Sequence, residues 1–333
     1  MRLGNLVTHI SAERDPHGEI MAADASKVLV IGASGFLGRH VSRALLAAGQ
    51  HVRCTARASA RIRDLAAAGC ETTRADISDY LSIEHALESV DAVYICVHTL
   101  SPQPDGAPHE GFMDVEKSGL QNIVKACAAQ GTRRLVYVTS LGVAPDARSA
   151  WLRGRWQAAQ LLLNSGLDVT VIQSGQMIGV GAQGFDLLVG QAKRPVAFGL
   201  GDGRQKSRSI GIDDLTYYLT GVLAEPRTYG QCYDVGSDDI LTDDEKIDVI
   251  ADLLGRRHPA KVHIPLGLIA PFAPLAGRLT KLPPGAVKGL LDSLRADMTG
   301  DPAPIRAILP RTPRAFREAA QVALNHEEVA ANG

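Results

Sequence analysis

A glycine-rich turn constrains this chain more than any other feature of its sequence. It reads Gly32-Ala-Ser-Gly35-Phe-Leu-Gly38 and lies between a β-branched run, residues 28–31, and a helical pattern over residues 36–48. Glycines there allow a tight bend, a close approach to a diphosphate and close packing of helix on strand, and the helix N-terminus offers amide donors to phosphates. The spacing differs from G-x-G-x-x-G, and a purely structural turn is the alternative. The turn therefore predicts a dinucleotide site that involves Gly32, Ser34, Gly35, Phe36, Leu37 and Gly38.

Strand and helix patterns alternate over the first half of the chain. The predicted strands cover residues 28–31, 51–56, 70–75, 92–97, 134–138 and 168–172. Predicted helices connect them at residues 36–48, 58–68, 81–88, 112–130 and 151–164. Strands that alternate with helices in this way form a parallel sheet with helices on both faces. The predicted fold class is therefore α/β, a doubly wound parallel Rossmann sheet with a smaller C-terminal substrate-side domain.

The residues after the second predicted strand bear on the choice of dinucleotide. An NAD site usually places an acid there to bind the ribose 2′-hydroxyl, but this chain has Arg57 and no acid. A cation favours a 2′-phosphate, so NADP(H) is predicted and NAD(H) is less favoured; a solvated Arg57, Arg53 or Arg61 is the alternative. Asp76 and Ile77, after the third strand, would lie near the adenine, although Asp76 could equally cap the next turn.

The helix and strand pattern loosens after residue 174, where glycines become frequent. Strands are predicted near residues 208–212 and 231–235, and helices near residues 214–223 and 242–254. We therefore divide the chain into four parts: a polar leader (1–26), an NAD(P)-binding Rossmann domain (27–174), a substrate-side and lid region interleaved with the sheet (175–325) and a tail (326–333).

One apolar stretch, residues 264–282, is interrupted by prolines and by Arg278 and Lys281. A membrane-spanning helix needs about 20 mostly apolar residues without such breaks, so no transmembrane segment is predicted. The stretch predicts a proline-rich cap over a pocket, and a peripheral membrane contact is the alternative.

Charge and cysteine usage exclude several classes of protein. The 35 Lys and Arg residues are balanced by 36 Asp and Glu residues, so the net charge of −1 gives no basic field for a nucleic acid. The five cysteines contain no C-x-x-C pair, which argues against a disulfide framework and a zinc site. Residues 1–27 lack the apolar core of a signal peptide. These features predict a cytoplasmic protein with no metal site and leave its oligomeric state open.

Five stretches of the sequence carry a family resemblance. They are residues 28–38 (VLVIGASGFLG), 92–98 (AVYICVH), 135–140 (LVYVTS), 165–172 (SGLDVTVI) and 209–214 (SIGIDD). On these stretches the chain resembles the atypical short-chain dehydrogenase/reductases, in particular their NAD(P)H-binding NmrA-like and YbjT-like branch, over roughly residues 27–324. The resemblance implies a Rossmann fold and a nicotinamide cofactor. It also implies cofactor contacts at Val97 and at one or more of residues 174–177, with Ser174 and Met177 as the first candidates.

Standard members of that superfamily use a Tyr-x-x-x-Lys pair for proton chemistry. The matching positions here hold Trp151 and Arg155, and residues 144–164 contain neither a tyrosine nor a lysine. Trp has only an indole N–H donor, and Arg can hold a ribose hydroxyl without exchanging protons. The resemblance places Ser140 in the active-site serine region, as a contact for substrate or nicotinamide, although the expected serine could also align with Leu141. His98, at the end of the fourth strand, could replace the missing acid, line the cofactor or be structural.

Two functions follow from these residues. The first is an NADPH-dependent oxidoreductase that reduces a small hydrophobic carbonyl or enone, with His98, Ser140 and Arg155 as candidate catalytic residues. The second is a non-catalytic NADP(H)-binding redox sensor or assembly protein, which needs the nucleotide site but no proton donor. A sugar-nucleotide epimerase is disfavoured, because its reaction both removes and returns a hydroxyl proton. The predicted partner is a small-molecule substrate.

Overall fold

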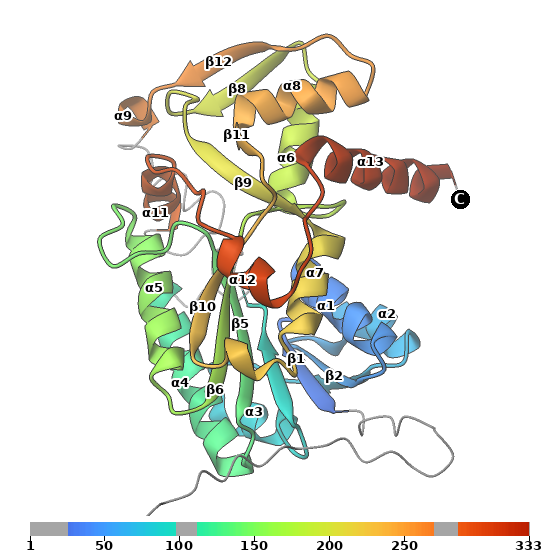
Figure 1. Cartoon of the computed structure of the whole chain (residues 1–333), viewed down its shortest axis with the longest axis vertical. Coiled ribbons are helices and arrows are strands. Elements are labelled where there is room, and N and C mark those ends of the chain that lie inside the picture. The colour runs from blue at the N-terminus through green and yellow to red at the C-terminus, as the bar shows by residue number, and fades with distance from the viewer. Residues whose placement is uncertain (1–25, 98–111, 270–285, 333) are drawn as a thin grey trace, which may run out of the picture.

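The protein is built around one parallel sheet of seven strands (Figure 1). The computed structural model describes residues 26–97, 112–269 and 286–332. The strands lie in the order β10-β6-β5-β4-β1-β2-β3, and every neighbouring pair is parallel. The order reverses between β1 and β4, where open α/β sheets bind their ligands. The strands are β1 (Lys27–Ile31), β2 (His51–Ala56), β3 (Glu71–Arg74), β4 (Ala92–Ile95), β5 (Arg134–Ser140), β6 (Asp168–Ser174) and β10 (Gln231–Val235).

Helices cover both faces of this sheet (Figure 1). Val28 and Val30 of β1 pack into a core shared with α1 and α7, whereas Leu29 and Ile31 pack into a second core with α3 and α4. Side chains of a strand alternate between the faces, so a strand covered on both sides is apolar throughout. One face carries α1 (Phe36–Ala47), α2 (Arg63–Ala67) and α7 (Ile212–Gly221), and the other carries α3 (Tyr80–Ala86), α4 (Phe112–Gln130) and α5 (Ala150–Leu163).

A smaller unit follows the carboxyl end of β6 and lies at the top of Figure 1. The chain enters it through Gly175, where a Cβ atom would lie 2.8 Å from the carbonyl oxygen of Arg208. Only glycine therefore fits at this crossing. The core of the unit contains Phe185, Ile250 and Phe316. Its strands form two small sheets, β11-β9-β7 and β12-β8.

The elements of the smaller unit come from the last half of the chain. The strands are β7 (Gln176–Ile178), β8 (Val196–Leu200), β9 (Lys206–Gly211), β11 (Ile240–Thr242) and β12 (Ala260–Ile264), and the helices packed on them are α6 (Gln183–Ala192), α8 (Asp243–Leu253) and α13 (Phe316–Asn332). Five short helices complete the described elements. In the layers of the main sheet lie η1 (Ser59–Ile62) and η2 (Pro226–Thr228), α11 (Ala286–Ser293) packs on α5, α12 (Ala303–Ile308) packs on β10, and α9 (Leu266–Ile269) follows β12.

The predicted doubly wound sheet is confirmed, and its six predicted strands correspond to β1–β6. The observed sheet has one strand more than the predicted one. This seventh strand, β10, comes from the region that the prediction assigned to the substrate side. β10 pairs with β6, and α7 packs against α1. The physical reason is that Tyr233 and Val235 of β10, like Leu215 and Leu219 of α7, bury their apolar side chains in the core beside α1. The division of the chain at residue 174 stays a prediction.

Several local expectations can be compared with the structure. The helix predicted over residues 58–68 is divided into η1 and α2. The predicted tail begins inside α13, which continues to Asn332. The predicted leader, up to residue 25, and most of the stretch 264–282 lie outside the described residues.

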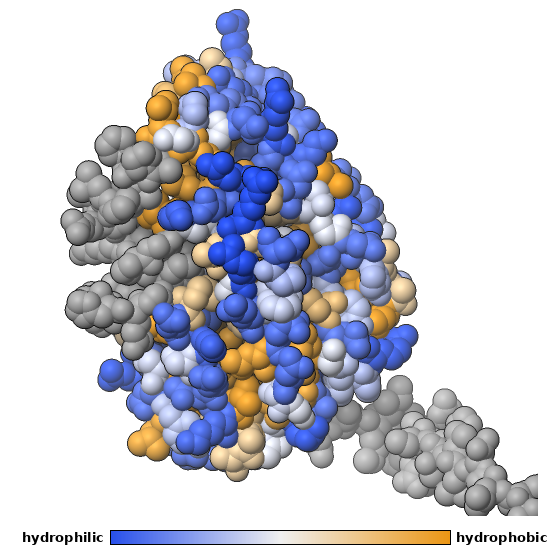
Figure 2. Space-filling view, turned by 90° about the vertical axis from the view of Figure 1, so that its left-hand side faces the viewer, coloured by the Kyte–Doolittle hydropathy of each residue, from blue (hydrophilic) through white to orange (hydrophobic). Residues whose placement is uncertain are grey.

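An apolar surface faces outward on the two-stranded sheet of the smaller unit. Phe198 and Leu200 of β8 pair with Val262 and Ile264 of β12, and all four side chains are exposed. Figure 2 shows hydrophobic residues gathered on the upper left of the molecule. In the parts of the chain that the structure describes, no helix has the length and apolar character needed to cross a bilayer. The peripheral membrane contact stays a prediction.

A buried arginine at the amino end of strand β5 binds the C-terminal end of helix α7. Arg134, at the start of β5, is 7% exposed. Its guanidinium donates to the carbonyl oxygens of Val222 (2.6 Å) and Leu223 (2.9 Å), at the end of α7, and of Asp168 (2.6 Å). Carbonyl groups at the end of a helix have no partner within the helix, so a cation there satisfies them.

Replacing this arginine should therefore loosen α7. We expect Arg134→Met to lower the free energy of unfolding by about 3 kcal/mol, because several charge-assisted hydrogen bonds are lost. The neighbouring Arg133, whose side chain is 64% exposed, bonds to Asp168 at the surface, and Arg133→Met should cost less than about 1 kcal/mol. Urea denaturation of both variants measures the difference, and equal losses would contradict the assigned role of Arg134.

Candidate functional site

A pocket of about 430 Å³ opens at the carboxyl ends of the central strands, beside the glycine turn. Its walls come from the start of α1, from the ends of β4, β5 and β6, from α5, from β7, and from the turn that leads into α6 together with the first residues of that helix. The lining residues are Gly35, Phe36, Leu37, Cys96, Val97, Val138, Thr139, Ser140, Trp151, Arg155, Ser174, Gly175, Gln176, Met177, Gly181, Ala182, Gln183 and Gly184.

The glycine turn fits a diphosphate through its backbone. Gly32 has a φ of +88°, and a Cβ atom there would lie 2.8 Å from the carbonyl oxygen of Cys96. A Cβ atom at Gly38 would overlap the carbonyl oxygen of Gly32, so α1 begins directly against the end of β1. Gly35 precedes α1 without any side-chain cap, and the first amides of the helix therefore remain available to an anion. This arrangement is what a dinucleotide diphosphate requires.

The region after β2 is rich in arginine. Arg57 directly follows β2 and is exposed. Arg39 on α1 binds the carboxylate of Asp64 and the carbonyl oxygen of Arg61, and the hydrogen bond from Arg39 lowers the pKa of Asp64. The charged carboxylate of Asp64 is therefore already paired with arginines of the protein. No acid stands directly after β2 to bind a ribose 2′-hydroxyl.

Asp76 and Ile77 are engaged within the protein. Oδ1 of Asp76 accepts hydrogen bonds from the amide (3.0 Å) and the hydroxyl (2.8 Å) of Ser78, which is the turn-capping alternative raised by the sequence. The side chain of Ile77 packs against α4, where a Cβ atom at Gly119 would lie 2.6 Å from it. Neither residue lines the pocket, and their contact with an adenine stays a prediction.

The pocket is mostly apolar, and its described walls contain one unsatisfied hydroxyl. Val97, Trp151 and Met177 are among the apolar side chains that line it. Oγ of Ser140 is buried, and none of the described residues or backbone groups bonds to it. The hydroxyl of Ser174 donates instead to the carbonyl oxygen of Gly175 (2.9 Å). A buried hydroxyl without a partner costs free energy, so the Ser140 hydroxyl is available to a bound molecule.

Arg155 takes part in a buried ion pair behind this wall. It is 3% exposed, and its guanidinium donates to Oε1 of the fully buried Glu116 (2.6 Å) and to Oγ1 of Thr139 (3.1 Å). The hydroxyl of Tyr137 donates to the same Glu116 oxygen (2.7 Å), and burial raises the pKa of Tyr137. The guanidinium is therefore bound to protein acceptors at the position where the resemblance implies a lysine. Its catalytic role stays a prediction.

Groups that titrate near neutral pH are missing from the described lining of the pocket. The lining residues that can ionise are Arg155 and Cys96, and burial raises the pKa of the Cys96 thiol to about 12. His98, the predicted replacement acid, lies outside the described residues. In the described part of the chain, the pocket walls therefore supply hydrogen-bond donors but no acid or base that exchanges protons near pH 7.

The structure brings most of the predicted site residues together. Those that line the pocket are Gly35, Phe36, Leu37, Val97, Ser140, Arg155, Ser174 and Met177, and those that lie outside its walls are Gly32, Ser34, Gly38, Arg57, Asp76 and Ile77. All of residues 174–177, where the resemblance implies one or more cofactor contacts, line the pocket, Gln176 included. The sequence predictions did not include the start of α6, at Gln183 and Gly184. The frequent glycines after residue 174 were the only signal for it.

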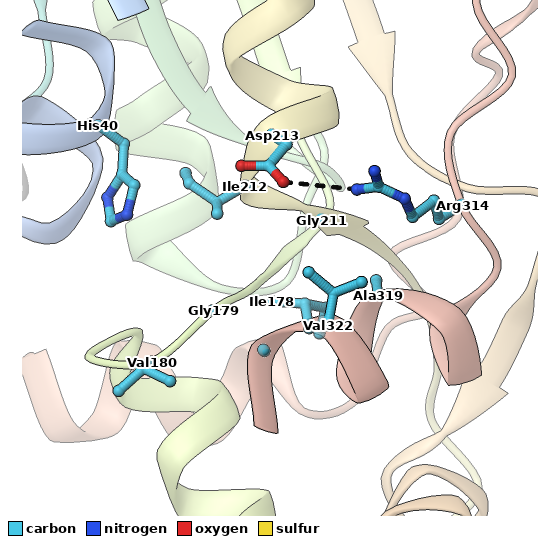
Figure 3. A pocket seen from close by; sticks show the side chains of 11 residues that line it. His40, Ile178, Gly179, Val180, Gly211, Ile212, Asp213, Arg314, Ala319 and Val322 are labelled. Atoms are coloured by element: carbon cyan, nitrogen blue, oxygen red, sulfur yellow. Dashed lines mark hydrogen bonds and ion pairs between the residues drawn. The ribbon is translucent and has the colours of Figure 1, made fainter. Parts of the chain in front are cut away.

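A second pocket, of about 340 Å³, lies between α1, α7 and α13 (Figure 3). His40 of α1 faces it, and Asp213 and Arg314 form an ion pair (3.4 Å) at its side. None of the predicted site residues lines it. The ring of His40 packs against the ring of Phe36 in a tilted arrangement, with 4.5 Å between centroids, so this ring pair lies between the two pockets. The pocket beside the glycine turn is the better candidate for the cofactor, because predicted cofactor residues line it and none lines the second pocket.

The fold and the glycine turn together define a dinucleotide-binding Rossmann protein. Residues 32–196 match the model of a family described as NAD(P)H-binding, and this part of the chain is an NAD(P)H-binding domain. The resemblance drawn from the sequence is thereby confirmed, and it is consistent with the NmrA-like and YbjT-like branch of the atypical short-chain dehydrogenase/reductases.

Three proteins show what this chain is similar to. The chain is 27% identical to the uncharacterized protein y4nG of Sinorhizobium fredii, over 79% of this chain and 69% of that protein. It is 25% identical to an NAD(P)H azoreductase of Xenophilus azovorans, over 83% of this chain and 94% of that protein. It shares its fold with an NADPH-dependent quinone oxidoreductase of Escherichia coli (18% identity, 90% of this chain, 99% of that chain, TM-score 0.68). Several other relatives match over only 34% of their own length.

The close contact at Gly38 gives a direct test of the site. We expect Gly38→Ala to abolish dinucleotide binding, because the added methyl group would force α1 away from Gly32. Gly49, at the other end of α1, has a φ of +80° and open space around it. Gly49→Ala should therefore lower stability by about 1 kcal/mol and leave binding unchanged. Calorimetric titration with NADPH, with circular dichroism as the folding check, compares them; wild-type affinity in Gly38→Ala would remove the turn from the site.

Proposed function

We propose that this protein is an NADPH-dependent oxidoreductase that reduces a small hydrophobic carbonyl or enone without a Tyr-Lys pair. The observation that carries the proposal is the buried, unpartnered hydroxyl of Ser140 in an apolar pocket that adjoins the glycine turn. The NAD(P)H azoreductase and the quinone oxidoreductase among its relatives support the same reaction type. We place the reaction in the cytoplasm, as the unpaired cysteines suggest.

In this proposal, different residues bind the cofactor, exclude water and bind the substrate oxygen. The amides at the start of α1 hold the diphosphate, and Arg57 binds the 2′-phosphate that distinguishes NADPH from NADH. The bound cofactor supplies a hydride. The apolar side chains of Val97, Trp151 and Met177 exclude water around the reacting carbon, and the hydroxyl of Ser140 donates a hydrogen bond to the substrate oxygen. Arg155 and Glu116 hold the end of β5, and with it Ser140, in place.

The replacement of the Tyr-Lys pair by Trp151 and Arg155 favours some substrates over others. Hydride addition to a simple ketone leaves an alkoxide, a strong base that must receive a proton at once. Hydride addition to an enone or a quinone leaves an enolate or a phenolate, which is a much weaker base and can take its proton from water. Because the described pocket walls hold no group that titrates near neutral pH, we infer that enones and quinones are the better substrates.

Turnover tests this function directly. We expect the protein to oxidise NADPH in the presence of menadione, followed at 340 nm, and to reduce saturated ketones of the same size much more slowly. Ser140→Ala should lower kcat/KM by roughly 10-fold or more, because one donor to the developing charge is lost, and should leave the affinity for NADPH unchanged. Ser165→Ala removes a hydroxyl that bonds to Leu162 at the end of α5 and should have no effect. Wild-type kcat/KM in Ser140→Ala would exclude its proposed role.

The choice of NADPH over NADH depends on Arg57. We expect Arg57→Ala to weaken NADPH binding about 10- to 100-fold and NADH binding by less than about 3-fold, because only NADPH carries the phosphate that pairs with the guanidinium. Arg63→Ala, in the same exposed region, is the control and should change neither. Equal losses for NADPH and NADH would remove Arg57 from the phosphate site.

A redox sensor or assembly protein that binds NADP(H) without turnover is the second candidate. The replacement of the Tyr-Lys pair by Trp151 and Arg155 favours it, since a sensor needs no proton donor. Its signature is tight binding of NADPH, a much weaker binding of NADP+ and no oxidation of NADPH with any enone or quinone. The turnover assay therefore distinguishes the two candidates.

A further inference from the structure

The smaller unit contains a buried lysine that has no part in the function proposed above. Lys246 lies on α8 and is 0% exposed. Its Nζ donates to Oε1 of Gln176 (2.7 Å) and to Oγ of Ser207 (2.5 Å), and lies 3.4 Å from Oδ1 of Asp243. Burying an ammonium group is costly unless hydrogen bonds and a counter-charge compensate for the lost water. These contacts therefore fix where the ammonium group lies.

The contact with Lys246 determines which way the amide of Gln176 faces. An ammonium group has donors only, so the Gln176 atom opposite it is the oxygen, and the NH2 group points away from the lysine. A Cβ atom at Gly184 would lie 3.2 Å from Nε2 of Gln176. Gly184 and Gln176 both line the pocket beside the glycine turn. The NH2 group therefore lies against the start of α6, at the wall of this pocket.

Gln176 and Ser140 line the same pocket. Ser140 pairs with Ser174 across β5 and β6, and Gln176 follows Ser174 by two residues, after the glycine crossing. Within the described chain, Nε2 of Gln176 donates to no protein acceptor, and Oγ of Ser140 has no partner. The described walls of the pocket include no carboxylate. Two donors in an apolar pocket match a molecule that offers acceptor oxygens.

We propose that Lys246 is a positioning residue that holds the Gln176 amide as a hydrogen-bond donor to the oxygen of the substrate. The proposal rests on the reductase function and narrows its substrate class. The pocket takes apolar molecules that present a carbonyl oxygen to Gln176, such as quinones and enones, whereas an ammonium group at the same place would set a donor against the NH2 donor of Gln176. Donation to the oxygen also stabilises the negative charge that hydride addition leaves there.

The first test reverses the hydrogen-bonding character of Gln176. Gln176→Glu keeps an oxygen opposite Lys246 and so retains a partner for the buried ammonium group, but it removes the donor from the pocket. We expect kcat/KM for menadione to fall roughly 10- to 100-fold, because an acceptor then faces an acceptor, and the affinity for NADPH to stay within about 3-fold of wild type. An equal loss of NADPH affinity would overturn the proposal, since Gln176 would then contact the cofactor.

The second test asks whether Lys246 acts through Gln176. We expect Lys246→Met to lower kcat/KM about 10-fold in the wild-type background and to have no further effect in the Gln176→Ala background, because the amide that it orients is then absent. Equal losses in both backgrounds would show a merely structural lysine. Lys261→Met is the matched control. Lys261, on β12, pairs with Asp248 of α8, the helix that carries Lys246, and it lies outside the pocket walls. If Lys246→Met fails to fold, Gln176→Glu decides the proposal.

Binding without turnover separates this proposal from the reductase function. NADP+ has no hydride to give, so menadione titrated into the complex with NADP+ measures binding alone. Binding that is weakened in Gln176→Glu, in a protein that never oxidises NADPH, would support the role of Gln176 and exclude the reductase. Turnover that is unchanged in Gln176→Glu would support the reductase and overturn the role of Gln176. Absence of both binding and turnover would overturn the proposed substrate class as well.

Discussion

The contact between the first helix and the first strand decides what this protein can offer to a ligand. A methyl group at Gly38 would overlap the carbonyl oxygen of Gly32, so helix α1 starts directly against the end of strand β1. Its first amides then lie at the carboxyl edge of the sheet, and no side chain caps them. The same close approach places Phe36 at the pocket wall, where Gly179 leaves room for its ring. The diphosphate cradle and the position of the pocket both follow from this one backbone contact.

Buried charged groups determine the positions of helix ends, strand ends and polar side chains, which apolar packing alone does not orient. Arg134 holds the end of α7 on the sheet, the ion pair of Arg155 with Glu116 holds the end of β5, and Lys246 holds Gln176. Each group loses water on burial and regains hydrogen bonds in fixed directions. Apolar contacts have no direction, so they can bring these elements together but cannot orient a hydroxyl or an amide. The orientation of the pocket donors therefore comes from polar contacts behind the walls.

The sheet was predictable because its evidence is local. The apolar run of residues 28–31 and the similar runs after it indicate strands that are buried on both faces. The spacing of the glycines indicates where the first helix begins. The loss of the Tyr-Lys pair was also readable, since it needs only the identities of Trp151 and Arg155. Strand β10 was recognised as a strand, but its place beside β6 was not, because a strand pattern does not specify its neighbour.

The sequence by itself determined the class of fold, the dinucleotide turn and the absence of the usual proton-transfer pair, because each is written in neighbouring residues. Only the tertiary structure decided which polar groups face the pocket. Gln176 and Lys246 are 70 positions apart in the chain, and Glu116 and Arg155 are 39 apart. No local pattern links residues at such separations, and burial alone makes their pairing obligatory. The physical reason is that a charged group removed from water must find its partner wherever the folded chain brings one.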